Sequence, residues 1–434
     1  MVNFKHLSFL LSWIFPTKRD RQIFRNLCNS IENRKSTIKV QENYQKTLKK
    51  LSKNDKHNVV FLVNEISKWK YQSLYDAMKN SNNYKPIVAL TIADIQKNLD
   101  IENKKNIIEN NGKFFQNKGI ETVIKYDLEE NKALSLNDLE PDIVFYQQPY
   151  NLPKVQAPEV VSKYALTAYV PYYLPDYRNF ELDCEWDFHH KVFRFYVLNE
   201  ELKQEYETHL KAINEFNGNF KAVGHTMLDL FAQKQNIENK GYVIYAPHWS
   251  IAQAGNENNI NISTFDQNGL EILEFAKNHP EINWAFKPHP TLKTALKRIG
   301  WTDESIENYY NEWEKIALVS YDSDYVDLFL SSKAMITDSG SFLLEYFVTG
   351  KPLIHLISDS ATNMPYRQLS EYFNSFYQAH NNEELSQFLD EVIINNNDYK
   401  FENRKKLLEK TNFSKENAAQ NILKDLDCIF KEAV

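Results

Sequence analysis

The sequence predicts an α/β protein made of two consecutive units, each with a parallel sheet between helices. Its 434 residues are too many for one ordinary hydrophobic core. Short apolar runs rich in β-branched residues alternate with polar stretches of helical periodicity, as in a sheet covered on both faces. The alternation stops and restarts around residues 225–240, which predicts a junction between the two units there.

The first unit is predicted to follow a helical N-terminal segment. Residues 20–56 are polar and free of glycine, and their spaced apolar positions predict one or two helices. The run HNVVFLVNE at 57–65 is continuous, apolar and β-branched, which is typical of a buried parallel strand. Further strands are predicted at 84–92, 119–126, 141–149 and 191–199, and helices at 69–78, 102–118 and 200–216.

The second unit repeats this alternation, and its strands lead into polar loops. Strands are predicted at 241–250, 282–290, 316–322, 334–342 and 351–357, and helices at 268–278, 325–332, 343–350 and along the C-terminal residues. The predicted domains are a helical segment at 1–56, an N-terminal Rossmann-like domain at 57–230, a C-terminal Rossmann-like domain at 231–405 and a C-terminal helix at 406–434.

The N-terminus carries an apolar run beside a basic cluster. The run HLSFLLSWIFP, from His6 to Pro16, is shorter than the roughly 20 residues that span a bilayer. Lys18, Arg19 and nearby arginines follow it, and no small-residue cleavage site does. The pattern predicts a helix at an anionic membrane surface, with packing on its own domain as the alternative.

Composition and missing motifs exclude several classes of protein. A net charge of −7 argues against a nucleic-acid partner. Cys28, Cys184 and Cys428 are far apart, which predicts no zinc site or disulfide framework and fits a cytoplasmic protein. The sequence holds no P-loop, GxGxxG or HExxH motif, and its DxD triplet at 322–324 is a weak signal. We therefore expect neither a metal nor a cofactor.

Three polar clusters follow predicted strands of the second unit. They are Pro247-His248-Trp249-Ser250, Lys287-Pro288-His289-Pro290 and Thr337-Asp338-Ser339-Gly340-Ser341. Ligands of open parallel sheets gather at the carboxyl ends of strands, so the three clusters are predicted to form one site.

The third cluster predicts a phosphate site because a strand runs through it directly into a helix. Gly340 permits close backbone approach, and Ser339 and Ser341 add hydroxyls to the amides of the helix start. Ordinary helix capping is the alternative interpretation. Glu345, one turn later, is predicted to accept ribose hydroxyls, or else to be a plain surface carboxylate.

The two strand-end histidines are the candidate catalytic residues. His289, held between prolines beside Lys287, is predicted to neutralise a departing phosphate. His248 is expected to assist it, with Ser250 nearby and Trp249 as a stacking or packing group. His225, at the junction, is assigned a structural role.

Together these residues resemble the CDP-glycerol glycerophosphotransferase family, the polymerases and primases of teichoic acids and related capsules. The resemblance covers about residues 190–360 and rests on VGHTMLDLF, YAPHWS, KPHP and ITDSGSFLLEYFVTGKPLI. It implies a GT-B fold, in which two Rossmann-like domains face each other across a cleft. UDP-N-acetylglucosamine 2-epimerases carry a similar TDSG turn, so the turn indicates the fold more firmly than the substrate.

The resemblance also implies site roles. His289 and the Ser339–Ser341 turn, with Lys287, Thr337 and Ser250, would hold the nucleotide diphosphate, and Glu345 stands where the family often has Asp. The family's WHG-type motif, which supplies a basic histidine, is absent, and Tyr172, Tyr173 and Asp176 occupy the nearest region. The expected acceptor side comprises Asn64, Glu65, Gln147, Tyr173 and Asp176.

The function implied by the resemblance is transfer of glycerol phosphate from CDP-glycerol to a hydroxyl of a cell-surface polysaccharide or teichoic-acid-like acceptor, with release of CMP. A lipid-linked acceptor would be met at the inner face of the plasma membrane. One alternative keeps the fold and uses a UDP- or CMP-activated sugar in capsule or lipopolysaccharide synthesis. Another is an inactive scaffold in a polysaccharide-assembly complex.

Overall fold

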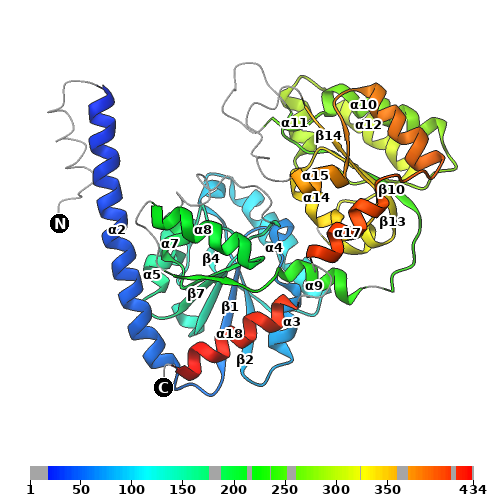
Figure 1. The fold of residues 1–434 in the computed structure, drawn as a ribbon. Coiled ribbons are helices and arrows are strands. Elements are labelled where there is room, and N and C mark those ends of the chain that lie inside the picture. Colours follow the sequence, from blue (N-terminus) through cyan, green and yellow to red (C-terminus); the bar gives the residue numbers. More distant parts are fainter. Residues whose placement is uncertain are drawn as a thin grey trace. The chain divides into compact units, whose positions relative to one another are not determined.

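The apolar runs of the chain form two parallel sheets, each in its own unit of the computed structural model (Figure 1). The structure describes residues 18–174, 187–212, 218–234, 236–251, 261–322, 324–358, 370–411 and 417–432. Unit 1 holds the described residues up to Tyr172, those from 187 to Val223 and those from Ala419. Unit 2 holds Tyr173, Leu174 and the described residues from Gly224 to Ala418.

Unit 1 contains a seven-stranded parallel sheet in the order β3-β2-β1-β6-β7-β8-β9. The chain moves outward from β1 to β3 and then starts again on the other side of β1 with β6. This reversal makes the ends of β1 and β6 the topological switch point of the sheet. The strands are β1 (His57–Val63), β2 (Tyr84–Leu90), β3 (Thr122–Ile124), β6 (Ile143–Tyr146), β7 (Leu166–Tyr169), β8 (Arg194–Val197) and β9 (Phe220–Ala222).

Helices cover this sheet, and a short hairpin follows β3. The helices are α2 (Lys18–Leu51), α3 (Gln72–Lys79), α4 (Ile101–Asn117), α5 (Pro158–Val161), α7 (Asp187–Lys191), α8 (Glu200–Ala212) and α18 (Ala418–Glu432). Single turns are η1 (Ile66–Lys68), η2 (Asp94–Gln96), η3 (Asn137–Leu139) and η4 (Lys154–Gln156), and the hairpin is β4 (Tyr126–Asp127) with β5 (Lys132–Ala133).

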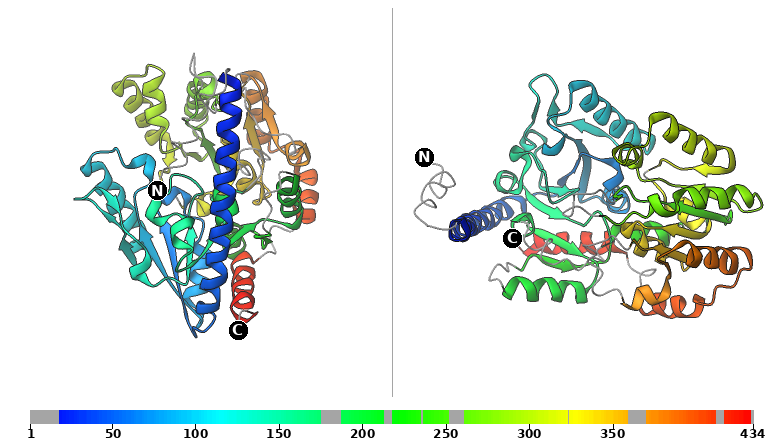
Figure 2. Two further views of the ribbon diagram at one scale, coloured as in Figure 1. Left: turned by 90° about the vertical axis from the view of Figure 1, so that its left-hand side faces the viewer. Right: turned by 90° about the horizontal axis from the view of Figure 1, so that it is seen from above.

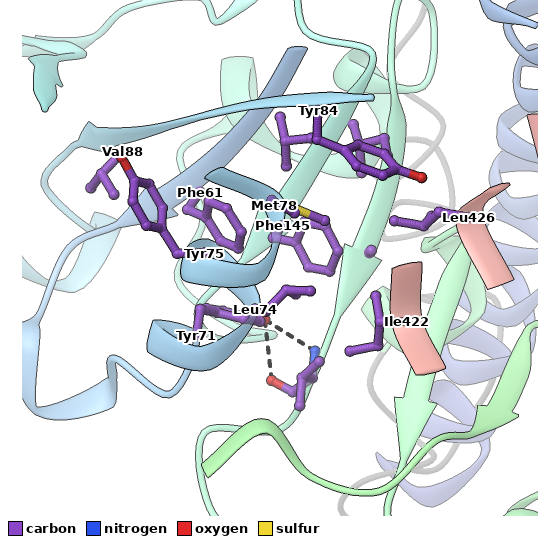
Figure 3. Packing of buried hydrophobic residues seen from close by; sticks show 14 of the residues in the cluster. Phe61, Tyr71, Leu74, Tyr75, Met78, Tyr84, Val88, Phe145, Ile422 and Leu426 are labelled. Atoms are coloured by element: carbon purple, nitrogen blue, oxygen red, sulfur yellow. Dashed lines mark hydrogen bonds between the residues drawn. The ribbon is translucent and has the colours of Figure 1, made fainter. Parts of the chain in front are cut away.

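Helix α18 brings the C-terminal residues back to unit 1. Its Ile422 and Leu426 are buried in the same cluster as Phe145 of β6 and Leu74 of α3 (Figure 3). Tyr71 closes this cluster, because its hydroxyl donates to the carbonyl of Tyr146 at 2.5 Å and accepts the Val170 N–H at 3.0 Å. The core of unit 1 therefore combines strands from its first half with the last described helix of the chain.

The N-terminal segment is one continuous helix, α2, where the sequence allowed one or two (Figure 2). Its C-terminal half lies against α5, α7 and β7. Tyr44 anchors it, because the buried phenol contacts the Thr167 hydroxyl and donates to the Lys191 carbonyl at 2.7 Å. The predicted membrane-surface segment, His6 to Pro16, lies outside the described residues. Among the described helices, none is long and apolar enough to cross a bilayer.

Unit 2 contains a six-stranded parallel sheet in the order β12-β11-β10-β13-β14-β15, which repeats the reversal of unit 1. Its switch point lies between the ends of β10 and β13. The strands are β10 (Tyr242–Ala246), β11 (Trp284–Phe286), β12 (Ala317–Val319), β13 (Ser332–Thr337), β14 (Leu353–Leu356) and β15 (Tyr377–Ala379). The helices are α9 (Thr226–Gln233), α10 (Phe265–Asn278), α11 (Leu292–Arg298), α12 (Asp303–Ile316), α13 (Val326–Leu330), α14 (Gly340–Phe347), α15 (Ser370–Ser375), α16 (Asn382–Phe388) with the π-helical turn η5 (Leu389–Ile394), and α17 (Phe401–Thr411).

Aromatic rings fill much of the core of unit 2. Phe286 of β11 stacks on Trp313 of α12, with ring centroids 4.9 Å apart, and Tyr245 of β10 lies 5.8 Å from Phe286. These rings hold β10 and β11 firmly against α12, so the loops that leave the carboxyl ends of the two strands have fixed starting points. The prediction of an α/β protein with two parallel sheets, a helical N-terminal extension and C-terminal helices is confirmed.

Candidate functional site

The three polar clusters of the second unit meet at the switch point of its sheet. Ala246 and Thr337, the last residues of β10 and β13, are paired in register, and the Thr337 hydroxyl donates to the Ala246 carbonyl at 2.6 Å. The loop after β11 joins them, because the His289 N–H donates to the Pro247 carbonyl at 3.1 Å. Clusters far apart in the sequence thus share one edge of the sheet.

Asp338 is the residue that ties these loops together, and the sequence singled it out only as part of a turn. Its buried carboxylate accepts the His248 N–H at 2.6 Å, the Thr264 N–H at 2.8 Å and the Ser263 hydroxyl at 2.9 Å. Burial raises the pKa of Asp338 to about 6, although the hydrogen bonds from Thr264 and His248 act in the opposite direction. The loop after β10 is therefore held by a carboxylate that takes up a proton near neutral pH.

His248 is fixed in one tautomer by its own loop. Its Nδ1 accepts the Ser250 N–H at 3.2 Å and lies 2.8 Å from the Ser250 hydroxyl. A backbone N–H can only donate, so Nδ1 carries the lone pair and the ring proton is on Nε2. Burial, and then the neighbouring His289, lower the pKa of His248 to about 3. His248 is thus a neutral imidazole with an Nε2–H donor.

His289 has the same arrangement in the neighbouring loop. Its Nδ1 accepts the Thr291 N–H at 3.2 Å, and the Thr291 hydroxyl lies 2.9 Å away. The rings of His248 and His289 are 5.2 Å apart between centroids and steeply inclined. His248 and His289 are both partly exposed, and Ser250 beside His248 is buried. Both rings offer a hydrogen-bond donor at Nε2, and neither can accept a proton at Nδ1 without losing an amide bond.

His225 follows the same local pattern and takes a structural place. Its Nδ1 accepts the Met227 N–H at 3.2 Å and so caps α9. The ring is 1% exposed. Its burial agrees with the structural role that the sequence suggested.

The start of α14 has the features of an anion site. Ser339 is the N-cap of this helix, yet its side chain makes no capping hydrogen bond and instead lies 3.2 Å from the Ser341 hydroxyl. The Ser339 N–H donates to Thr337 Oγ1 at 3.0 Å, which fixes the turn. Since the cap hydroxyl is not used on the first helical turn, amides near Gly340 and Ser341 remain suited to bind an oxyanion.

Glu345 and Lys287 lie deeper than the sequence indicated. Glu345 is 1% exposed and accepts a hydrogen bond from the Tyr325 hydroxyl. Burial, and then the Glu345 carboxylate, raise the pKa of Tyr325 far above its ordinary value, so the phenol remains a donor. Lys287 lies over the Tyr325 ring at 5.1 Å and donates to the Asp322 carbonyl at 2.7 Å. The roles of Glu345 toward ribose and of Lys287 toward phosphate stay predictions.

An aromatic and basic rim borders the histidines. The Arg298 guanidinium lies 5.6 Å from the ring centroid of Trp249, and Trp249 lies 6.2 Å from His289.

No group of three His, Cys, Asp or Glu side chains in the described part of the chain has an arrangement that could hold a metal ion.

Three of the expected acceptor residues lie at the switch point of unit 1. Asn64 and Glu65 follow β1 directly, and Gln147 follows β6. The Gln147 side chain accepts the N–H groups of Asn64 and Glu65 at 3.0 Å each and donates to the Glu65 carbonyl at 2.5 Å. Asn64 and Gln147 are buried, whereas Glu65 and Tyr173 are partly exposed. Asp176 lies outside the described residues.

The two Rossmann-like units give the chain a GT-B-like fold, and unit 2 carries the candidate anion site at the start of α14. The sequence profile of the CDP-Glycerol:Poly(glycerophosphate) glycerophosphotransferases matches residues 223–427. The C-terminal part of the chain is therefore similar to this family, as the motifs of unit 2 suggested. No curated protein matches the chain in sequence.

Solved structures agree with the fold. The wall teichoic acid polymerase TagF is similar over 96% of this chain and 98% of its own, with a TM-score of 0.53 and 14% identity. S. aureus MnaA, solved with UDP, is similar over 85% of this chain and 95% of its own, with a TM-score of 0.51 and 11% identity. The UDP-GlcNAc 2-epimerase of Neisseria meningitidis, solved with UDP-GlcNAc, has a TM-score of 0.50 and 14% identity over 85% of this chain and 98% of its own.

Proposed function

We propose that this chain transfers glycerol phosphate from CDP-glycerol to a hydroxyl of a cell-surface polysaccharide or teichoic-acid-like acceptor and releases CMP. The observation that carries this proposal is the pair of imidazoles, His248 and His289, at the strand-end edge that leads into α14, each with its Nδ1 accepting a backbone N–H. The match of unit 2 to the glycerophosphotransferase family supports the choice of donor.

The donor diphosphate binds at the carboxyl edge of unit 2. It accepts hydrogen bonds from Nε2–H of His248 and His289, from the Ser339 and Ser341 hydroxyls and from amides at the start of α14. Lys287 adds positive charge next to this edge. Neutral donors suit the reaction because their hydrogen bonds strengthen as negative charge builds on the departing CMP phosphate. The imidazoles do not have to become cations to give this stabilisation.

In the transfer step the acceptor oxygen attacks the phosphorus that bears glycerol. A new P–O bond forms, the bond to the CMP phosphate oxygen breaks, and its electron pair leaves with CMP. The acceptor enters at the switch point of unit 1, near Asn64, Glu65 and Gln147, with Tyr173 and Asp176 as further candidates. Gln147 contributes mainly by fixing the backbone of Glu65, since its amide is already used there.

The enzyme works in the cytoplasm at the inner face of the membrane, where its N-terminal segment meets anionic lipid and a lipid-linked acceptor. The support is the apolar run from His6 to Pro16 followed by a basic cluster. Sedimentation with anionic vesicles of the full chain and of a chain starting at Lys18 tests this contact, and equal binding of the two would contradict it.

Nucleotide binding tests the proposed donor. CDP-glycerol, CDP-ribitol, UDP-GlcNAc and CMP are compared by calorimetry and by the shift in Tm, because a ligand that binds the native state stabilises it. We expect CDP-glycerol to bind and to release CMP when acceptor is added. Ser341→Phe should abolish binding, and Ser386→Phe, at an exposed position of α16, should leave it unchanged.

Other outcomes identify a different function. Binding of a UDP- or CMP-activated sugar in place of CDP-glycerol would make the chain a glycosyltransferase. Absence of binding by any nucleotide would favour a scaffold in a polysaccharide-assembly complex and would contradict the proposal.

A further inference from the structure

The second half of helix α2 carries a concentration of positive charge that the proposed site does not use. Between Arg34 and Lys53 the chain has seven basic side chains and one acidic side chain, Glu42, whereas the net charge of the whole chain is −7. All seven basic side chains are exposed. The positive charge is therefore local to this helix and to the turn that follows it.

This half of α2 packs on unit 1 through one side. Val40, Tyr44, Thr47 and Leu51 are each at most 5% exposed, and they share one side of a helix with 3.6 residues per turn. The helix lies against α5, α7 and β7 and runs along the outside of unit 1 (Figure 1). Its other sides are available to a partner.

The side turned away from the buried one is a row of charges. At about 100° per residue, six residues between 34 and 51 leave the helix axis within one sector of about 100°, and all six are charged and exposed. They are Lys35, Lys39, Glu42, Lys46, Lys49 and Lys50. The five lysines of this sector form the lysine row. From Lys35 to Lys50 it extends over roughly 22 Å, at 1.5 Å per residue.

The lysine row has little negative charge beside it. Among the described residues, the ion pairs of unit 1 join other lysines to carboxylates, as Lys125 to Asp138 and Lys191 to Glu159. Glu42 stands in the sector itself, three residues after Lys39 and four before Lys46, where it can weaken the field of both. Five lysines with one carboxylate among them attract an anion.

The shape and composition of the row favour a linear polyanion over a bilayer. A helix that binds a bilayer gains from apolar side chains that enter the acyl boundary, and this sector holds none. A lysine ammonium binds phosphate as a point charge and does not require a fixed geometry. Successive ammoniums along a helix can therefore follow a flexible chain of phosphates.

We propose that the lysine row of α2 binds the anionic chain of the acceptor. This inference rests on the proposed function, because each glycerol phosphate added to a teichoic-acid-like acceptor leaves a phosphodiester with a negative charge. The row binds phosphodiesters that are already in the chain and takes no part in bond formation. Its contacts release counterions, so binding strengthens with the number of phosphates bound and weakens with salt.

The first test measures binding of end-labelled poly(glycerol phosphate) to the full chain by fluorescence anisotropy. The row variant combines Lys39→Gln, Lys46→Gln and Lys50→Gln. Its control has the same change at three exposed lysines of unit 1 outside α2, which are Lys85, Lys113 and Lys424. We expect the row variant to lose about tenfold in affinity, and its plot of log affinity against log salt to become shallower by about two.

The control should keep the wild-type affinity within about twofold. Glutamine and lysine have similar helix propensities, so α2 should remain folded, and a thermal melt verifies this. Unchanged affinity of the row variant, or an equal loss in the control, would overturn the inference. So would a row variant that loses binding to anionic vesicles but keeps its affinity for the polymer.

Glu42→Gln tests the sign of the effect. Removing the carboxylate from the sector should raise the affinity for poly(glycerol phosphate) by about two- to threefold, a gain that a merely structural role of α2 does not predict. A loss of affinity in this variant would contradict the inference.

CMP release separates this inference from the proposed function. With an acceptor that carries a single glycerol phosphate, the row variant should keep the wild-type kcat and KM, and with a long acceptor its KM should rise. An unchanged KM for the long acceptor would overturn the inference alone. Failure of the unchanged protein to bind CDP-glycerol would overturn the proposed function, and the assigned role of the lysine row with it.

Discussion

The two switch points share one device and differ in its chemistry. In unit 1 the device lies at the ends of β1 and β6, and in unit 2 it lies at the ends of β10 and β13. In each unit the side chain just after the second of these strands accepts backbone N–H groups of the loop that follows the first. In unit 1 this clasp is the neutral amide of Gln147, which holds Asn64 and Glu65. In unit 2 it is the carboxylate of Asp338, which holds His248.

The difference shows how one strand order serves two kinds of ligand. The clasp of unit 1 presents a carboxylate, a lysine and phenols, which suit a hydroxyl-bearing acceptor. The clasp of unit 2 presents imidazole donors and a helix start, which suit a diphosphate. The strand order determines where the binding site lies in each sheet, and the side chains at the strand ends determine which ligand binds there.

The largest effect is expected at His289, where two variants test whether the imidazole donates a hydrogen bond or accepts a proton. His289→Asn retains an acceptor near Nδ1 but removes the Nε2 donor, whereas His289→Gln places an amide N–H near the former Nε2. We expect His289→Asn to lower kcat by about 10²–10³-fold and His289→Gln to recover part of this loss. Steady-state CMP release measures both, and equal inactivity of the two variants would indicate that His289 accepts a proton.

The second prediction concerns the charge of the Asp338 clasp. Burial raises the pKa of Asp338 in the folded protein to about 6. Asp338 therefore adds to the free energy of unfolding at low pH, and this contribution is lost as the pH rises from about 4 to about 6. His248, lowered to about 3, acts in the opposite sense and costs stability as pH falls below 6.5. The wild-type free energy of unfolding should therefore change little over this range, because the two contributions oppose each other.

Asp338→Asn should expose the contribution of His248 alone. Relative to wild type, the variant is expected to gain about 3 kcal/mol of stability between pH 4 and pH 7, at about 1.4 kcal/mol for each unit of pKa shift. Urea unfolding across this range measures it, with the exposed Asp390→Asn as control. A constant difference between variant and wild type would contradict the prediction.

The third prediction addresses the neutral clasp of unit 1. Gln147→Met keeps the size of the side chain but leaves the N–H groups of Asn64 and Glu65 without their acceptor. We expect the free energy of unfolding to fall by about 2 kcal/mol at every pH, with CDP-glycerol affinity unchanged. A tenfold loss of CDP-glycerol affinity would contradict the expectation that a change at the carboxyl edge of the unit 1 sheet leaves donor binding unaffected.

The smallest effect is expected at the rim of unit 2. Arg298→Ala removes the guanidinium from the Trp249 ring, a contact worth about 0.5–1 kcal/mol at an exposed position. CDP-glycerol affinity should fall by no more than about fivefold, as calorimetry can measure. A loss of a hundredfold would make Arg298 a direct ligand of the diphosphate.

The sequence predicted the long strands and the convergence of the polar clusters, because apolar runs and parallel order determine both. It did not assign β7, whose four residues precede a proline-rich stretch, or the three-residue strands β9 and β15. Nor did it identify the partners of Asp338, since Ser263 and Thr264 are more than 70 residues away. The burial of Glu345 against Tyr325 has no local pattern in the sequence either.

Helix α18 has a consequence for how the chain is made. Unit 1 lacks Ile422, Leu426 and Phe430 until α18 has left the ribosome, although its first strand was synthesised long before. The arginine Arg194 and the phenol of Tyr84 likewise wait for Asp425 and Asp427. The central stretch, Gly224–Ala418, is continuous and can fold first. A nascent chain therefore exposes apolar side chains of unit 1 that α18 later covers, and we expect unit 1 to depend on chaperones until α18 has been synthesised.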